Sequence, residues 1–93
     1  MEFRQLQYFV AVAEEESFSR AAEKMNVSQP SLSKAIQSIE DEYGVTLVKR
    51  TTRSFKLTDA GELIFKQGEK LIDDYEQLKD KLSELSSDYM SEI

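Results

Sequence analysis

The sequence predicts a mainly α-helical fold, in which three short helices precede a small β-hairpin and one long helix. Apolar residues recur at helical spacing in four stretches, and two short segments rich in β-branched residues interrupt this pattern between residues 45 and 57. Residues 58–93 then keep a 3.5-residue apolar repeat without a proline. The 93 residues, 40% of them hydrophobic, suffice for one small core, so we expect a domain over residues 1–57 and a helical appendage over residues 58–93.

The first helix is predicted from about Phe3 to Glu15. Leu6, Phe9, Val10 and Ala13 fall at positions i, i+3, i+4 and i+7, which places them on one face of an α-helix. A helix with one apolar face buries that face against a neighbour, so this helix is expected to form part of the core.

Two further helices follow, and the link between them is very short. Ser17 is a suitable N-cap for a helix that ends near Asn26, and Ser28 is a suitable N-cap for a helix that Gly44 ends. Only Asn26 and Val27 stand between the second helix and the cap of the third. This tight link predicts a helix-turn-helix.

The next segment is predicted to be a β-hairpin, with strands over Val45–Arg50 and Ser54–Leu57 around a polar tip at residues 51–53. The tip lacks the Gly or Asn that a two-residue turn needs, so we expect a looser loop of three or more residues. A hairpin in this place is a wing. The predicted fold class is therefore a winged helix-turn-helix, three helices plus a two-stranded wing, followed by a long dimerisation linker helix.

The long helix is predicted from its cap, Thr58, to about Met90. Its apolar positions alternate steps of four and three, which is typical of a coiled-coil seam. These positions are Ile64, Gly68, Leu71, Tyr75, Leu78, Leu82, Leu85 and Tyr89, with Gly68 as the one gap. Such a helix is roughly 50 Å long, too long for so small a domain to cover its apolar stripe.

We expect a second copy of the chain to bury this apolar stripe. The dimerisation candidates are Ile64, Leu71, Tyr75, Leu78, Leu82 and Leu85. Gly68 and Tyr75 suit a parallel zipper poorly and acidic residues flank the seam, so we expect antiparallel pairing. The alternative is a solvated amphipathic linker that packs only on its own domain.

The net charge of −6 is unevenly distributed along the chain. Residues 1–57 hold eight Lys or Arg and eight Asp or Glu, whereas residues 58–93 hold four and ten. The excess acidity therefore belongs to the long helix, and the first domain remains compatible with nucleic-acid binding.

Small and polar residues occupy the start and the outward face of the third helix. A recognition helix contacts base edges mainly with its N-terminal residues, where glutamine can pair with adenine, serine with several bases, lysine with guanine or phosphate, and proline with a thymine methyl. A cap serine and first-turn N–H groups can hold a phosphate. The candidate DNA-binding residues here are Ser28, Gln29, Pro30, Ser31, Ser33, Lys34 and Gln37. The alternative is that they form only a solvated face.

The predicted wing is basic, with Lys49, Arg50, Arg53 and Lys56. An arginine at its tip can enter a narrow A·T-rich minor groove or hold phosphates, and Arg53 is the candidate for that role. Arg50 has two readings: it contacts DNA, or it pairs with an acid such as Glu40 and braces the fold.

Composition excludes several other functions. The chain has no cysteine and no histidine, which removes disulfides, thiolate or imidazole metal sites and His-dependent catalysis, so neither a metal nor a cofactor is expected. There is no Gly-rich phosphate loop and no nucleophile beside a base, so the chain is not expected to be an enzyme. No apolar run approaches membrane-spanning length, and we expect a cytoplasmic protein. The remaining alternative is a protein-interaction module whose acidic tail keeps it off DNA.

Residues 17–36, SFSRAAEKMNVSQPSLSKAI, resemble the helix-turn-helix signature of LysR-type bacterial transcriptional regulators. Ile39-Glu40, the stretch Leu47–Arg50 and the stretch Leu57–Gly61 continue the resemblance at the family's spacing, so it covers nearly the whole chain. Met25 and Ile39 stand where Leu is common, and Val48 where Phe is common; all three keep the apolar character.

The resemblance implies a homodimer on double-stranded DNA, with linker helices that pair antiparallel and an interrupted inverted repeat as the target. It implies DNA contacts from Ser28, Gln29, Pro30, Ser31, Ser33, Lys34 and Arg53. Family members usually continue into a larger effector-binding domain, so we expect either a truncated or a naturally short form here, and small-molecule sensing only through that absent C-terminal domain. The sequence leaves open whether dimers pair into tetramers in a full-length protein.

Overall fold

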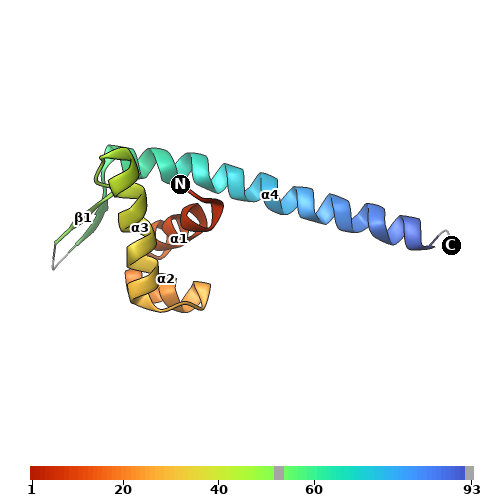
Figure 1. Ribbon diagram of the computed structural model, residues 1–93, viewed down its shortest axis with the longest axis horizontal. Helices are drawn as coiled ribbons and strands as arrows, with labels where there is room; N and C mark the ends of the chain where they lie inside the picture. The colour runs from red at the N-terminus through yellow and green to blue at the C-terminus, as the bar shows by residue number, and fades with distance from the viewer. Residues whose placement is uncertain (52–53, 92–93) are drawn as a thin grey trace.

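Helices dominate the fold, as the sequence predicts, and the hairpin lies between the third helix and the long one. The computed structural model describes residues 1–51 and 54–91. In chain order the elements are α1 (Phe3–Glu15), α2 (Phe18–Met25), α3 (Gln29–Tyr43), β1 (Val48–Arg50), β2 (Phe55–Leu57) and α4 (Asp59–Ser91). The first three helices gather beside the N-terminal half of α4, whose C-terminal half extends away from them (Figure 1). The predicted winged helix-turn-helix with a long helix is confirmed.

The helices begin and end close to where their capping residues predict. The hydroxyl of Ser17 accepts a hydrogen bond from the Arg20 N–H at 3.1 Å, and the hydroxyl of Thr58 accepts one from the Gly61 N–H at 3.1 Å. Gly44 ends α3 with a φ of 65°, a left-handed conformation that glycine adopts without strain.

The turn between α2 and α3 is held by its own backbone. Asn26 adopts a left-handed φ of 58°, and its N–H donates to the Glu23 carbonyl at 3.1 Å. The Val27 N–H donates to the Ala22 carbonyl at 3.0 Å. Asparagine is one of the few residues other than glycine that tolerates this conformation, which explains the sharpness of a turn without glycine.

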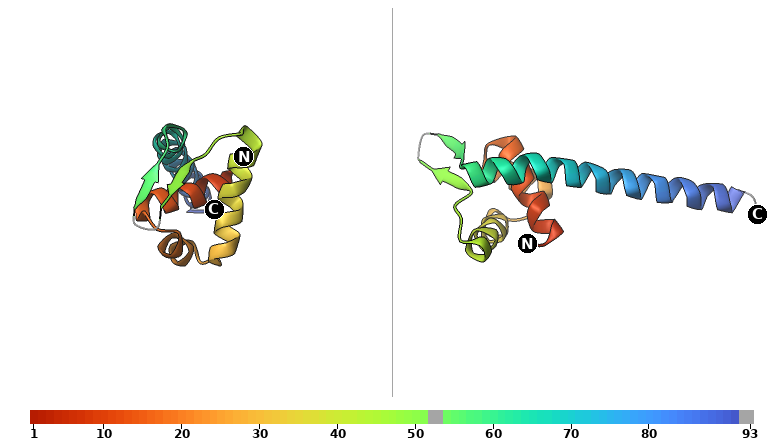
Figure 2. Two further views of the ribbon diagram at one scale, coloured as in Figure 1. Left: turned by 90° about the vertical axis from the view of Figure 1, so that its left-hand side faces the viewer. Right: turned by 90° about the horizontal axis from the view of Figure 1, so that it is seen from above.

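The core lies where α1, α3 and the chain leading into the wing meet. Phe9, Leu32, Ile36, Ile39 and Leu47 are fully buried. The three helices α1, α2 and α3 pack against one another in this part of the molecule (Figure 2). Burial of these side chains fixes which face of α3 remains outside.

The hairpin is shorter than its sequence predicts. β1 and β2 pair antiparallel with Val48 opposite Leu57, so residues 45–47 and Ser54 lie outside the strands, contrary to the prediction. The Leu47 N–H donates to the Glu40 carboxylate at 2.7 Å, and the Leu47 carbonyl accepts from the Thr58 N–H at 3.0 Å. The backbone of this segment thus bonds to the end of α3 and the start of α4 instead of to β2.

Two glycines let α4 approach the rest of the fold closely. A Cβ at Gly61 would lie 2.2 Å from the Leu47 carbonyl oxygen, and one at Gly68 would lie 2.9 Å from side-chain carbons of Leu6 and Val10. The sequence presents Gly68 as a gap in a seam. The structure shows that its missing side chain is the space into which α1 packs.

Candidate nucleic-acid interface

The first three turns of α3 present a polar face on an apolar support. Leu32, Ile36 and Ile39 are fully buried beneath this helix. The predicted DNA-binding residues lie on its first turns and outer side: Ser28, Gln29, Pro30, Ser31, Lys34 and Gln37 are exposed, and Ser33 is half-buried. The structure therefore exposes six of the seven candidates at the start and along the outer side of α3, opposite its buried apolar side.

The two serines at the start of α3 form a short chain of hydrogen bonds. The Ser28 hydroxyl accepts from the Ser31 N–H at 3.2 Å and donates to the Ser31 hydroxyl at 2.8 Å. Because the proton of Ser28 is used inside the helix, the Ser31 hydroxyl is the one left to donate outward. A phosphate or base acceptor at this end of the helix would thus meet Ser31.

The remaining polar side chains of this face differ in how they are held. Within the described part of the chain, neither Gln29 nor Lys34 makes a side-chain hydrogen bond or an ion pair, so both can bond a ligand without breaking an internal contact. Gln37 is different, because its amide nitrogen donates to the Asp41 carboxylate at 3.0 Å. Asp41 is missing from the predicted site, although a Gln and an Asp four residues apart on a helix are a recognisable signal for such a bond.

The wing places two lysines directly opposite each other. Lys49 pairs with Lys56 across the strands and both are exposed. The predicted Arg53 lies outside the described residues, as does the side chain of Arg50. The Glu40 carboxylate, one of the two partners considered for Arg50, accepts a hydrogen bond from the Leu47 N–H at 2.7 Å and so braces the fold.

The predicted seam of α4 divides into two parts. Ile64 is half-buried and packs against the core of its own domain. Five seam residues beyond it stay largely exposed, between 43% and 65% of their surface: Leu71, Tyr75, Leu78, Leu82 and Leu85. A row of exposed leucines on one face of a helix marks an interaction surface.

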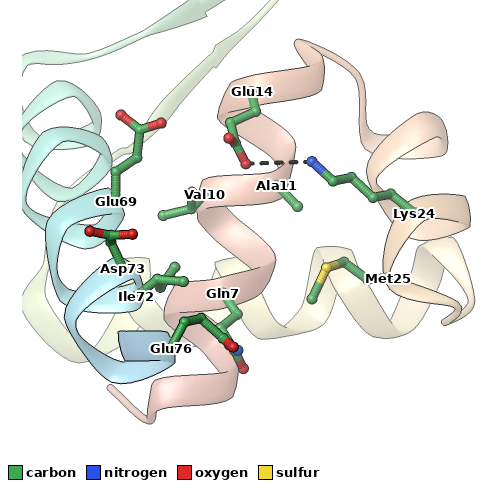
Figure 3. A pocket seen from close by; sticks show the side chains of 10 residues that line it. All are labelled: Gln7, Val10, Ala11, Glu14, Lys24, Met25, Glu69, Ile72, Asp73 and Glu76. Atoms are coloured by element: carbon green, nitrogen blue, oxygen red, sulfur yellow. Dashed lines mark ion pairs between the residues drawn. The ribbon is translucent and has the colours of Figure 1, made fainter. Parts of the chain in front are cut away.

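A groove with a very different character is lined by residues of α1, α2 and α4. It has a volume of about 310 Å³, an apolar floor that includes Val10 and Ile72, and a rim that includes the carboxylates of Glu69 and Asp73 (Figure 3). The one lysine at this groove, Lys24, is already ion-paired with Glu14 at 3.6 Å. An acidic rim repels phosphate, so this side of the molecule is unsuited to nucleic acid.

Neither a membrane span nor a metal site is present among the residues that the structure describes. Within residues 1–51 and 54–91, no helix is both long and apolar enough to span a membrane. The same described residues contain no cluster of acidic side chains placed to hold a metal ion.

Comparison with known proteins identifies the family. Residues 3–62 match the family described as bacterial regulatory helix-turn-helix protein, lysR family. A probable cat1 operon transcriptional activator of Acinetobacter lwoffii is 48% identical over 79 residues, which are 85% of this chain and 26% of that protein. The HTH-type transcriptional regulator BenM of Acinetobacter baylyi is 40% identical over 87 residues, 94% of this chain and 29% of BenM. The chain thus spans about a quarter of the length of these relatives.

Solved structures agree with the sequence relatives. The BenM DBD in complex with catB site 1 DNA has a TM-score of 0.88 at 40% identity, covering 94% of this chain and 98% of that one. A complex of the CbnR DBD with DNA has a TM-score of 0.81 at 35% identity, covering 92% and 99%. These relatives are named as transcriptional regulators and not as enzymes. The chain therefore belongs to the lysR family of bacterial regulatory helix-turn-helix proteins and carries that family's winged helix-turn-helix.

Proposed function

We propose that this chain binds double-stranded DNA in a sequence-specific manner, as a homodimer, and thereby regulates transcription in the cytoplasm. The observation that carries the proposal is the face of α3: seven small or polar residues on a fully buried apolar support, with Gln29 and Lys34 free of internal bonds within the described residues. Side chains of this kind at the start of a recognition helix read base edges in the major groove. The DNA complexes among the structural neighbours support this role.

The contacts of α3 divide by chemistry. Gln29 and Gln37 read adenine, Ser31 and Ser33 donate to base or phosphate acceptors, and Pro30 contacts a thymine methyl. Lys34 binds guanine or a phosphate, and Ser28 shapes the helix start through its bonds to Ser31. Arg50 and Arg53 act from the wing, on phosphates and in the adjacent minor groove.

The second copy covers the exposed part of the α4 seam. Leu71, Leu78, Leu82 and Leu85 each keep more than half of their surface exposed in the single chain. Antiparallel pairing sets the acidic flanks of one helix against different positions of the other and avoids aligning like charges along the whole length. A two-fold dimer of this kind places its two recognition helices in successive major grooves, about 34 Å apart, and so favours an interrupted inverted repeat.

The experiment that tests this function is selection of bound sequences from a random duplex library, followed by affinity measurements on the winning sequence at two salt concentrations. An interrupted inverted repeat whose affinity falls steeply with salt supports a dimeric DNA reader. Recovery of no common sequence, together with weak binding that is indifferent to sequence, contradicts the proposal and favours a protein-interaction module.

A further inference from the structure

The bond between Gln37 and Asp41 involves two exposed side chains on the outer face of the recognition helix. The Gln37 amide nitrogen donates to a carboxylate oxygen of Asp41 at 3.0 Å, across one helical turn. Both residues are exposed, and Asp41 forms no ion pair within the described residues. The contact therefore serves neither core packing nor charge neutralisation in the free chain.

The chemistry of the two groups determines how the amide is oriented. An ionised carboxylate only accepts hydrogen bonds, whereas the two ends of a glutamine amide differ, one accepting and the other donating. The nitrogen of Gln37 must therefore face Asp41, because its oxygen would be repelled there. The carbonyl oxygen and the second N–H of the amide are left to face a ligand.

This remaining pair of groups matches one base. Adenine offers an N–H donor at N6 beside an acceptor at N7 in the major groove, so it can pair with one amide oxygen and one amide N–H. Guanine offers two acceptors, O6 and N7, and repels an amide oxygen held in the same place. A glutamine that is free to turn over can instead direct its nitrogen to guanine.

We infer that Asp41 is a positioning and specificity-determining residue: it holds the Gln37 amide in the orientation that accepts adenine and rejects guanine. The inference rests on the proposed function, because it assumes that Gln37 reaches a base edge. Asp41 itself need not touch DNA. The negative charge of its carboxylate weakens binding to DNA of any sequence. Its contribution is therefore a preference for adenine over guanine and not a gain in affinity.

The test compares base preference among variants on duplexes that carry either A·T or G·C at each position of the selected half-site. Gln37→Ala locates the base pair that Gln37 reads. Asp41→Asn is then expected to lower the adenine-to-guanine affinity ratio at that same base pair about twofold. This factor corresponds to the stabilisation that one side-chain hydrogen bond contributes at this helical spacing. Because a dimer reads both half-sites, changing both base pairs together squares the ratio to about fourfold.

Three controls make the outcome specific. Glu42→Gln removes the same charge one residue away. It breaks the ion pair of Glu42 with the Met1 ammonium but does not touch Gln37, so it should leave the ratio unchanged. Asp41→Glu keeps an acceptor-only group and should retain more of the preference than Asp41→Asn does. Adding Asp41→Asn to Gln37→Ala should change the ratio no further.

The possible results separate the inference from the proposed function. A wild-type chain that selects no sequence contradicts the proposed function. If the wild-type chain selects a sequence, but Asp41→Asn keeps the adenine-to-guanine affinity ratio while Gln37→Ala loses it, the positioning role alone is overturned. A Gln37→Ala variant without any change in base preference also overturns it, since Gln37 then reads no base.

Discussion

The ring of Phe3 lies against the ring of Tyr75, with centroids 4.7 Å apart and planes inclined by 44°. The pair joins the start of α1 to the exposed seam of α4, and both rings remain partly exposed, 37% for Phe3 and 43% for Tyr75. The ammonium of Lys79 lies over the ring of Tyr75, 5.5 Å from its centroid. Phe3 thus extends the apolar surface of the seam onto the first domain.

Replacing Phe3 with Ala is expected to lower the free energy of unfolding by about 1 kcal/mol, the weight of one aromatic pair. Urea titration followed by circular dichroism at a fixed protein concentration measures this change, since the stability of a dimer depends on concentration. Phe3→Leu, which keeps most of the apolar area, should lose less. Equal stability of Phe3→Ala and the wild type would show that the ring pair contributes nothing.

Leu78→Asp is expected to convert the proposed dimer to a monomer, because pairing would bury an unpaired carboxylate. Affinity for the selected DNA should fall as well, since two linked recognition helices bind more tightly than one. Sedimentation velocity measures the mass directly. The matched control is Leu63→Asp: Leu63 is also exposed, at 62%, but lies off the seam, so this variant should remain a dimer. An unchanged mass for Leu78→Asp would exclude the seam as the interface.

Gln29→Ala is expected to cost about 1–3 kcal/mol of binding free energy on the selected sequence and much less on random DNA. The reason is that a base contact is lost while every phosphate contact remains. Fluorescence anisotropy on the two duplexes measures the difference. Gln67→Ala removes an exposed glutamine from α4 and should change neither value. Equal losses on both duplexes would remove Gln29 from the base-reading residues.

Arg53→Ala is expected to weaken binding to selected and random DNA alike and to lower the slope of log affinity against log salt by about 1. This is the behaviour of a residue that neutralises a phosphate. Affinities at four or more salt concentrations give the slope. A loss confined to one base pair, with the slope unchanged, would instead assign Arg53 a base contact.

Gly61→Ala is expected to destabilise the fold by about 1–3 kcal/mol, because the new methyl group would meet the Leu47 carbonyl oxygen at 2.2 Å. Gly68→Ala should cost less. There the contacts are side-chain ends of Leu6 and Val10, which can shift, and alanine favours a helix over glycine by up to about 1 kcal/mol. Thermal unfolding of both variants tests this order, and a more stable Gly61→Ala would contradict the packing described here.

Features that depend on neighbouring residues in the chain could be predicted from the sequence. The bounds of α1, the caps at Ser17, Ser28 and Thr58, and the stop at Gly44 follow from short-range hydrogen bonds and apolar spacing, and the structure reproduces them. The polar face of α3 follows from the same spacing, because three isoleucine or leucine residues fix its opposite side.

Features that depend on contacts distant in sequence could not be predicted. Residues 45–47 have the composition of a strand, but the Glu40 carboxylate and the Thr58 N–H take the hydrogen bonds of Leu47. In the sequence, Gly68 can be either a gap in the periodic seam or the site of a close contact with α1. Only the packing of Leu6 against Gly68 in the structure distinguishes these two possibilities. The bond between Gln37 and Asp41 is an exception, because it is local and its spacing could have been recognised in the sequence.

Charge is distributed along the molecule in a way that affects how it meets its target. No acidic residue stands between positions 43 and 58, where the wing carries four Lys or Arg, while residues 58–93 have a net charge of −6. In a single chain, 59 Å long, this separation amounts to a large electric dipole moment. In the proposed antiparallel pair the components along the two α4 helices oppose each other, so the acidic helices lie in the middle of the pair and the basic wings toward its two ends. The basic wings should attract DNA from a distance, so added salt should slow the formation of the encounter complex as well as weaken the final complex.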